Sequence, residues 1–141
     1  MLRDLAFPRA GRRSRSSSWD RRGANDDHVV VEPGGTHALL DVGGPGMVTH
    51  IWITVNTENP TYLRDVVLEM TWDGAAHPAV VAPLGDFFAL GHARMASVTS
   101  LPITVVAGGA SGRCRVAPPC ATLTSRTRAS LRGPQSLRWG R

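Results

Sequence analysis

The chain has 141 residues, of which 42% are hydrophobic and 19% charged, so it is long enough to form one domain with a hydrophobic core. It contains no apolar stretch of the length that a membrane span requires, and arginines interrupt its first 15 residues where a secretory signal would be continuously apolar. These features argue against a membrane-bound or secreted protein, and we expect a cytoplasmic protein with no membrane partner.

Charge is distributed unevenly along the chain. Residues 1–107 hold nine arginines and all eleven acids, a net charge of −2, whereas residues 108–141 hold seven arginines and no acid, a net charge of +7. Such a basic segment can bind nucleic acid by neutralising phosphates. Its arginines, however, alternate with Ser, Thr, Pro and Gly and lack an aromatic periodicity. We therefore expect no nucleic-acid partner, and keep binding through the tail as an alternative.

The N-terminal segment, residues 1–18, is polar and arginine-rich and is predicted to be an extended arm. Ordered structure is expected to begin near Trp19. Asn25, Asp26 and Asp27 then precede the β-branched run 29–31. Three short polar side chains at the start of a strand can cap a turn, or they can line a pocket with hydrogen-bond acceptors. Both interpretations remain open.

Short strands separated by Gly, Pro and Asp turns predict the fold. No segment has a convincing helical period, apart from a single turn expected at 61–63 after Asn59-Pro60. The predicted strands are 29–31, 36–41, 47–55, 64–72, 77–82 and 101–107. This pattern predicts an all-β domain over residues 19–107, a jelly-roll β-sandwich.

Residues 47–55 alternate with two largely apolar faces, which predicts a central strand covered on each side. His50 and Trp52 are two residues apart and hence side by side on one face. They could be a core pair, or they could form a platform on which a sugar ring stacks.

The segment from Pro83 to His92 joins a lone acid, Asp86, to the aromatic pair Phe87 and Phe88 between two glycines. Gly85 and Gly91 are expected to permit backbone turns that a side chain would forbid, which places Asp86 on a constrained loop at a strand end. Asp86 could contact a ligand beside an apolar wall, or it could cap a turn while the two phenylalanines fill the core.

Residues 108–141 lack acids and strand alternation, and we expect them to be disordered because this composition buries little apolar surface. Cys114 and Cys120 match no zinc spacing, and the five histidines are scattered. No metal site and no cofactor are therefore expected.

Several motifs, taken together in order, resemble the N-terminal part of glycoside hydrolase family 172, a family first catalogued as a domain of unknown function. They are S-S-S-W-D-R-R-G-A-N-D-D (16–27), G-G-P-G-M-V-T-H-I-W-I-T (43–54), W-D-G (72–74), A-P-L-G-D-F-F-A-L-G-H (82–92) and S-L-P (100–102). The similarity extends from about residue 4 to residue 107. It implies the first half of a double jelly roll, assembly into trimers or hexamers, and action on α-D-fructofuranosides or D-arabinofuranosides.

The resemblance also implies a retaining mechanism with two glutamates, which the family places in the later part of its fold. The chain has only Glu32, Glu58 and Glu69, all in the earlier part, so none inherits a catalytic role. We therefore expect no catalytic residue in this chain. The acid-free tail in a lysine-free sequence suggests a frameshift or truncation near residues 108–113.

The expected function is that of an N-terminal fragment of a furanosidase, inactive alone. The alternatives are a non-catalytic carbohydrate-binding or oligomerisation module and, last, nucleic-acid binding. The candidate sugar contacts are polar or aromatic residues in the matching motifs: Trp19, Asn25, Asp26, Asp27, His50, Trp52, Asp86 and Phe87.

Overall fold

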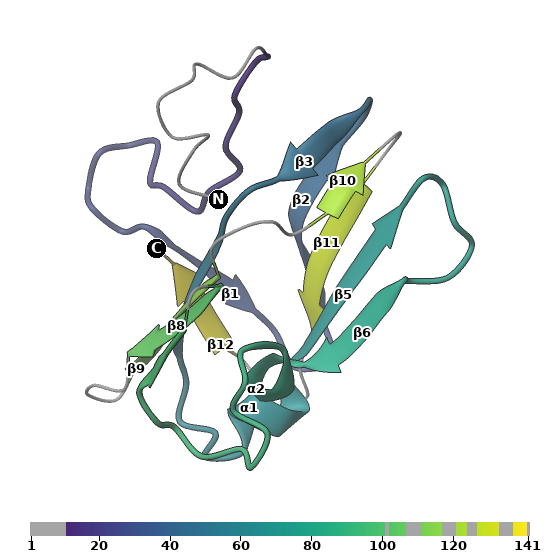
Figure 1. Cartoon of the computed structure of the whole chain (residues 1–141). Coiled ribbons are helices and arrows are strands. Elements are labelled where there is room, and N and C mark those ends of the chain that lie inside the picture. Colours follow the sequence, from purple (N-terminus) through teal and green to yellow (C-terminus); the bar gives the residue numbers. More distant parts are fainter. Residues whose placement is uncertain are drawn as a thin grey trace.

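The computed structural model of the chain describes residues 11–100 and 102–106 and, beyond them, four strand segments within 111–140 (Figure 1). The strands are β1 (His28–Val31), β2 (Thr36–Val42), β3 (Gly46–Val48), β4 (Ile51–Asn56), β5 (Val67–Trp72), β6 (Val80–Pro83), β7 (Val98–Thr99), β8 (Ile103–Val106), β9 (Ser111–Val116), β10 (Ala121–Leu123), β11 (Thr127–Arg132) and β12 (Leu137–Gly140). The helices α1 (Tyr62–Asp65) and α2 (Leu84–Phe87) are one turn each. Neither of these described helices has the length or apolar character to cross a membrane.

The strands form a six-stranded sheet in the order β1-β12-β4-β9-β8-β7, a four-stranded sheet in the order β2-β11-β5-β6, and the small pair β10-β3. All the strand pairs are antiparallel. The prediction of an all-β chain is therefore confirmed, and the specific jelly-roll topology stays a prediction.

The core forms on one face of β4. Ile53 and Val55 alternate along this strand and are almost completely buried, as the predicted period of two requires. They belong to one cluster with Val31 of β1 and Leu68 of β5. Burying a side chain of this size stabilises a fold by about 1.5–3 kcal/mol. This cluster therefore holds strands of both sheets together.

The single strand predicted at 47–55 is two strands in the structure. β3 ends at Val48 and β4 begins at Ile51, so Thr49 and His50 form a break between them. β4 is central in its sheet, as predicted, with β12 and β9 on its two sides. The expectation that both of its faces are covered was wrong, because Trp52 on the second face is 39% exposed.

The tail expected to be disordered contributes strands in four segments, β9 to β12, which corrects that expectation for these residues. The residues between them lie outside the described part of the chain. β9 and β12 pair with the two edges of β4, and β11 pairs with both β2 and β5. The physical reason is backbone pairing: the N–H and C=O groups of β4 and β5 need neighbouring strands as partners, whatever the composition of those strands.

The turn predicted at 61–63 occurs one residue later, as α1. The buried Asn59 organises its entry: its Oδ1 accepts hydrogen bonds from the Thr61 backbone N–H (2.9 Å) and hydroxyl (2.8 Å). Its Nδ2 donates to Asp65 Oδ2 at 2.9 Å. Hydrogen bonds from Thr61 and Asn59 lower the pKa of Asp65. The side chains around α1 thus supply the bonds that so short a helix lacks.

α2 occupies the first half of the Pro83–His92 segment, where a loop was predicted, and packs beside α1 (Figure 1). Gly85 is needed here for close approach, since a Cβ at this position would lie 2.9 Å from the Leu63 carbonyl oxygen and 3.2 Å from that of Leu90. The left-handed backbone expected at Gly85 and Gly91 is found instead at Ala89, with φ of 64°. The prediction of constrained glycines was thus right for Gly85 but for another physical reason.

A substitution at Gly85 tests this contact. We expect Gly85→Ala to lower the free energy of unfolding by about 1–3 kcal/mol, because two backbone carbonyls must move to admit the methyl group. Urea unfolding of the full chain, followed by tryptophan fluorescence, measures the change.

The matched control is Gly91→Ala, in the same segment, where an added Cβ meets nothing within 4 Å. Its unfolding midpoint should equal or exceed that of the wild type. Equal destabilisation by the two substitutions would contradict the packing of α2 on α1.

Candidate functional site

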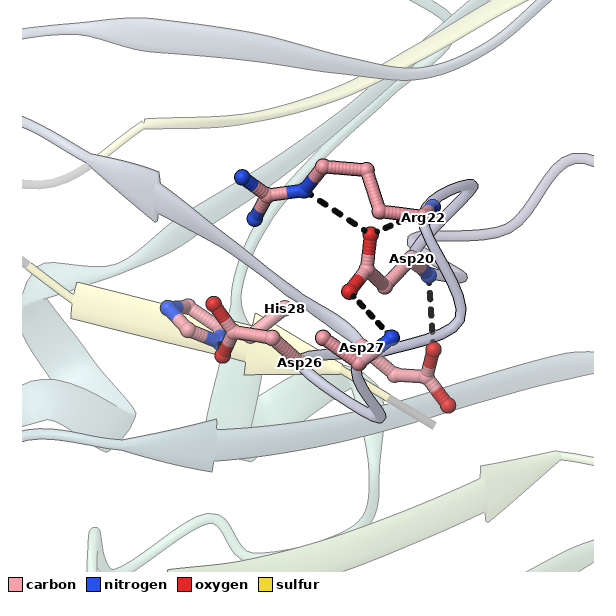
Figure 2. A network of polar contacts seen from close by, with 6 residues as sticks. Asp20, Arg22, Asp26, Asp27 and His28 are labelled. Carbon is pink, nitrogen blue, oxygen red and sulfur yellow. Dashed lines mark hydrogen bonds and ion pairs between the residues drawn. The ribbon is translucent and has the colours of Figure 1, made fainter.

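A tight turn before β1, residues 18–28, holds several of the polar residues singled out in the sequence, and we call it the acidic turn (Figure 2). Asp27 is directed back into it: its Oδ1 accepts from the Asp20 backbone N–H at 2.7 Å, and its carbonyl accepts from the Ser18 hydroxyl at 3.0 Å. Asn25 has φ of 61°, a left-handed conformation that asparagine tolerates better than most residues. Asn25 and Asp27 therefore shape the turn.

Asp20 closes the acidic turn from the other side. Its Oδ1 accepts from the Arg22 backbone N–H at 2.9 Å, and its Oδ2 accepts from the Ala24 N–H at 3.0 Å. The Arg22 Nε lies 3.4 Å from Oδ1, and the Asp20 side chain is only 7% exposed. The bond from the Arg22 N–H, followed by those from the Ala24 N–H and the Arg22 side chain, lowers the pKa of Asp20.

Asp26 and His28 lie together in the acidic turn, and their side chains point away from that of Asp27 (Figure 2). The His28 Nδ1 is 2.6 Å from Asp26 Oδ1, so an Nδ1–H donated to the carboxylate leaves Nε2 as the imidazole's second polar atom. The Asp26 side chain is 56% exposed. This pair can offer both a hydrogen-bond acceptor and an imidazole nitrogen to a ligand.

His50 and Trp52 lie side by side, as predicted. Their ring centroids are 6.4 Å apart and the planes are inclined by 77°. Both residues are exposed, which favours the platform over the core pair. A polar ligand can use the face of an exposed indole ring, whereas a core pair would be closed to it.

The acidic turn and the His50–Trp52 pair lie at the same end of the six-stranded sheet. Both β1 and β4 run antiparallel to β12 between them, and Gly140 of β12 is opposite both His28 of β1 and Thr54 of β4, so the residues just before His28 lie two strands from the first half of β4. That spacing corresponds to about 10 Å across the sheet. Trp19, 52% exposed, leads into the acidic turn. We call this end of the sheet, with Trp19, the acidic turn, His50 and Trp52, the aromatic end.

Asp86 and Phe87 belong to α2, beyond the other end of β4 (Figure 1). The six residues of β4 span about 17 Å at the usual rise of a strand, so the aromatic end and α2 are well separated. The structure therefore divides the eight predicted contacts into six at the aromatic end and two at α2.

The sequence analysis missed three residues that make specific contacts. Asp20 and His28 anchor and extend the acidic turn, and Arg64 binds Asp86. The D-x-H spacing of Asp26 and His28 could have indicated their contact, because the side chains of two residues on either side of one turn residue can reach each other. The Arg64–Asp86 pair spans 22 residues and left no local signal.

Among the described residues, no group of three or more His, Cys, Asp or Glu side chains is arranged to hold a metal ion. Glu32 follows β1, Glu58 lies between β4 and α1, and Glu69 is in the middle of β5. The aromatic end therefore offers chemistry for binding: acceptors, an imidazole and aromatic faces.

The lowered pKa of Asp20 predicts acid sensitivity. The folded pKa lies below the ordinary value of 3.8, so the folded state favours the ionised carboxylate. Its stabilising contribution is complete above that value and is lost as pH falls through the folded pKa. We expect the unfolding midpoint to drop across this acid range, and Asp20→Asn to weaken the dependence. Thermal unfolding at a series of pH values measures it.

Glu58→Gln is the control, because this exposed acid lies outside the acidic turn. Its pH dependence should match that of the wild type. An NMR titration in which the Asp20 carboxyl titrates at or above its ordinary pKa would contradict the hydrogen bonding described here.

Comparison with known proteins gives the family. A family model described as GH172 domain-like matches residues 22–104, more than half of the chain, from the acidic turn through β8. No curated protein matches the chain. The matched segment contains the Asp26–His28 pair, His50, Trp52, and both short helices. The chain is therefore a member of the GH172 domain-like family.

Proposed function

We propose that the chain is the sugar-recognising N-terminal part of a glycoside hydrolase that acts on furanosides of the α-D-fructofuranoside or D-arabinofuranoside type. Membership in the GH172 domain-like family supports the reaction class. The observation on which the proposal rests is the exposed Trp52 ring beside His50, at the same end of the sheet as the exposed Asp26 carboxylate with its partner His28.

The residues at this end suit a sugar for separate chemical reasons. The indole face of Trp52 packs against the C–H face of a furanose ring, with His50 bordering it. The exposed Asp26 carboxylate accepts hydrogen bonds from ring hydroxyls, and the imidazole of His28 supplies a further polar contact. Trp19 adds a second exposed aromatic surface. Asn25 and Asp27 contribute by holding the turn that presents Asp26.

We further propose that this chain binds the sugar without cleaving it. Retaining hydrolysis needs two carboxyl groups about 5 Å apart on either side of the scissile bond. The three glutamates occupy two linkers and the middle of β5, and the family resemblance assigns the catalytic pair to a later segment. Asp26 at the aromatic end is paired with His28, which suits it to hydrogen bonding.

A complete carbohydrate-binding or oligomerisation module is the second candidate. The observation that favours it is exposed apolar surface on several strands, with Val30, Val81 and Val106 each more than 40% exposed. Burial of such side chains between identical copies would stabilise a homo-oligomer. Light scattering on the purified chain distinguishes the two candidate functions. Only the second candidate requires these 141 residues alone to form an oligomer of defined size.

The recognition proposal predicts the effect of removing the indole. We expect Trp52→Ala to weaken binding of methyl α-D-arabinofuranoside or methyl α-D-fructofuranoside about tenfold, by loss of the stacking surface. Isothermal titration calorimetry measures it. Val81→Ala, at an even more exposed apolar residue in the other sheet, should bind as the wild type does. Binding that survives Trp52→Ala unchanged would place the sugar elsewhere.

The absence of catalysis is tested separately. The purified chain should release no p-nitrophenol from p-nitrophenyl α-D-arabinofuranoside above the rate in buffer, even at concentrations that saturate binding. Turnover that co-purifies with the chain and is lost on substitution of Glu32, Glu58 or Glu69 would show that the catalytic acids are present after all.

A further inference from the structure

Arg64, at the exposed side of α1, bridges two points of the segment that contains α2. Its Nη1 donates to Asp86 Oδ2 at 2.5 Å, and its Nη2 donates to the Gly91 carbonyl oxygen at 2.7 Å. One guanidinium group thus binds both the start and the end of the stretch from Asp86 to Gly91. The planar, forked arrangement of arginine donors suits this bridge, and a lysine ammonium does not reproduce it.

The base from which Arg64 reaches is itself fixed. The neighbouring Asp65 accepts hydrogen bonds from Asn59 and Thr61, and Leu63 is buried against Gly85. α1 therefore cannot shift without breaking the core contact and the polar contacts around Asp65. Because Arg64 extends from this fixed helix, its guanidinium group holds the Asp86 carboxylate in one position.

The Asp86 carboxylate keeps one oxygen for another partner. Arg64 contacts Oδ2, the side chain is 35% exposed, and within the described part of the chain Arg64 is its one side-chain partner. Oδ1 is then a hydrogen-bond acceptor of fixed position at the surface.

An aromatic side chain follows Asp86 in α2. Phe87 is half-buried, and its ring meets that of the fully buried Phe88 edge to face, with centroids 5.3 Å apart. Phe88 packs in the core and so anchors Phe87. A carboxylate oxygen and an anchored, partly exposed phenyl ring on the same helical turn can together receive a hydroxyl-bearing ring with one polar and one apolar face.

We infer that Arg64 is a positioning residue that orients Asp86 to accept a hydrogen bond from a sugar hydroxyl, making α2 a second contact point for an oligosaccharide. The inference rests on the proposed function. Because α2 lies beyond the end of β4, and the strand from Trp52 to that end alone spans about 13 Å, this contact involves a different sugar unit from the one at Trp52. The ligand class is accordingly an oligofuranoside longer than a disaccharide.

A double-mutant cycle tests whether Arg64 acts through Asp86. The probe is an arabinofuranosyl oligosaccharide of four to six units, with the methyl monosaccharide for comparison. The variants are Arg64→Gln, Arg64→Lys, Asp86→Asn and the double variant Arg64→Gln/Asp86→Asn, measured by calorimetry well below their unfolding midpoints. Arg94→Gln is the control, an exposed arginine that follows the same segment.

We expect Arg64→Gln and Asp86→Asn each to raise the oligosaccharide Kd about tenfold, the loss of one hydrogen bond to a charged group. The double variant should be no weaker than either single variant, because both remove the same contact. Arg64→Lys should recover part of the affinity, and the monosaccharide Kd and Arg94→Gln should not change. A purely structural role for Arg64 would lower the unfolding midpoint and leave the oligosaccharide Kd unchanged.

Additive effects in the double variant, or an unchanged Kd in Arg64→Gln, would overturn the positioning role while leaving the proposed function intact. A wild-type chain that binds neither the monosaccharide nor the oligosaccharide would overturn the proposed function and this inference together.

Discussion

The backbone of β4 is the constraint on which most of the fold depends. It lies inside the six-stranded sheet, so both of its hydrogen-bonding edges need partners, and these come from segments more than 50 residues later in the chain, β9 and β12. The same strand points Ile53 and Val55 into the core and Trp52 to the surface. One short strand thus sets the sheet order, anchors the core and places the aromatic side chain on which the proposed function rests.

The two ends of β4 have different local chemistry. At its start are exposed aromatic rings and the acidic turn, a set of residues arranged by backbone hydrogen bonds. At its end are α1 and α2, held by the close contact of Gly85 with Leu63 and by the arginine bridge. An extended ligand could touch both ends, whereas a single furanose ring could touch one. The length of the strand therefore bears on the size of ligand that the domain accommodates.

Most of the strands could be predicted from the sequence because alternation is a local signal. The prediction succeeded for β1, β2, β5, β6 and β8 to within three residues at each boundary. It failed where the deciding interaction is distant: strands in the tail depend on pairing with β4 and β5, and α2 depends on α1 being next to it. The His50–Trp52 pair was predictable from its spacing. The separation of Asp86 from the other candidates was not, because the course of the chain between Asn56 and Pro83 decides it.

Five of the described aspartates fall into two groups by the donors they bind, and among these five the division identifies those available to a ligand. Asp20, Asp27 and Asp65 accept from backbone N–H groups, hydroxyls or an amide within their own turn, with the Arg22 side chain as an additional donor to Asp20, and their function is to hold that turn. Asp26 and Asp86 each pair with a cationic or imidazole side chain and keep a substantial exposed fraction. A carboxylate saturated by backbone donors has little capacity left for a hydroxyl, while one held by a single side chain retains an oxygen for it. Of these five aspartates, the two that retain an oxygen for recognition are therefore Asp26 at one end of β4 and Asp86 beyond the other.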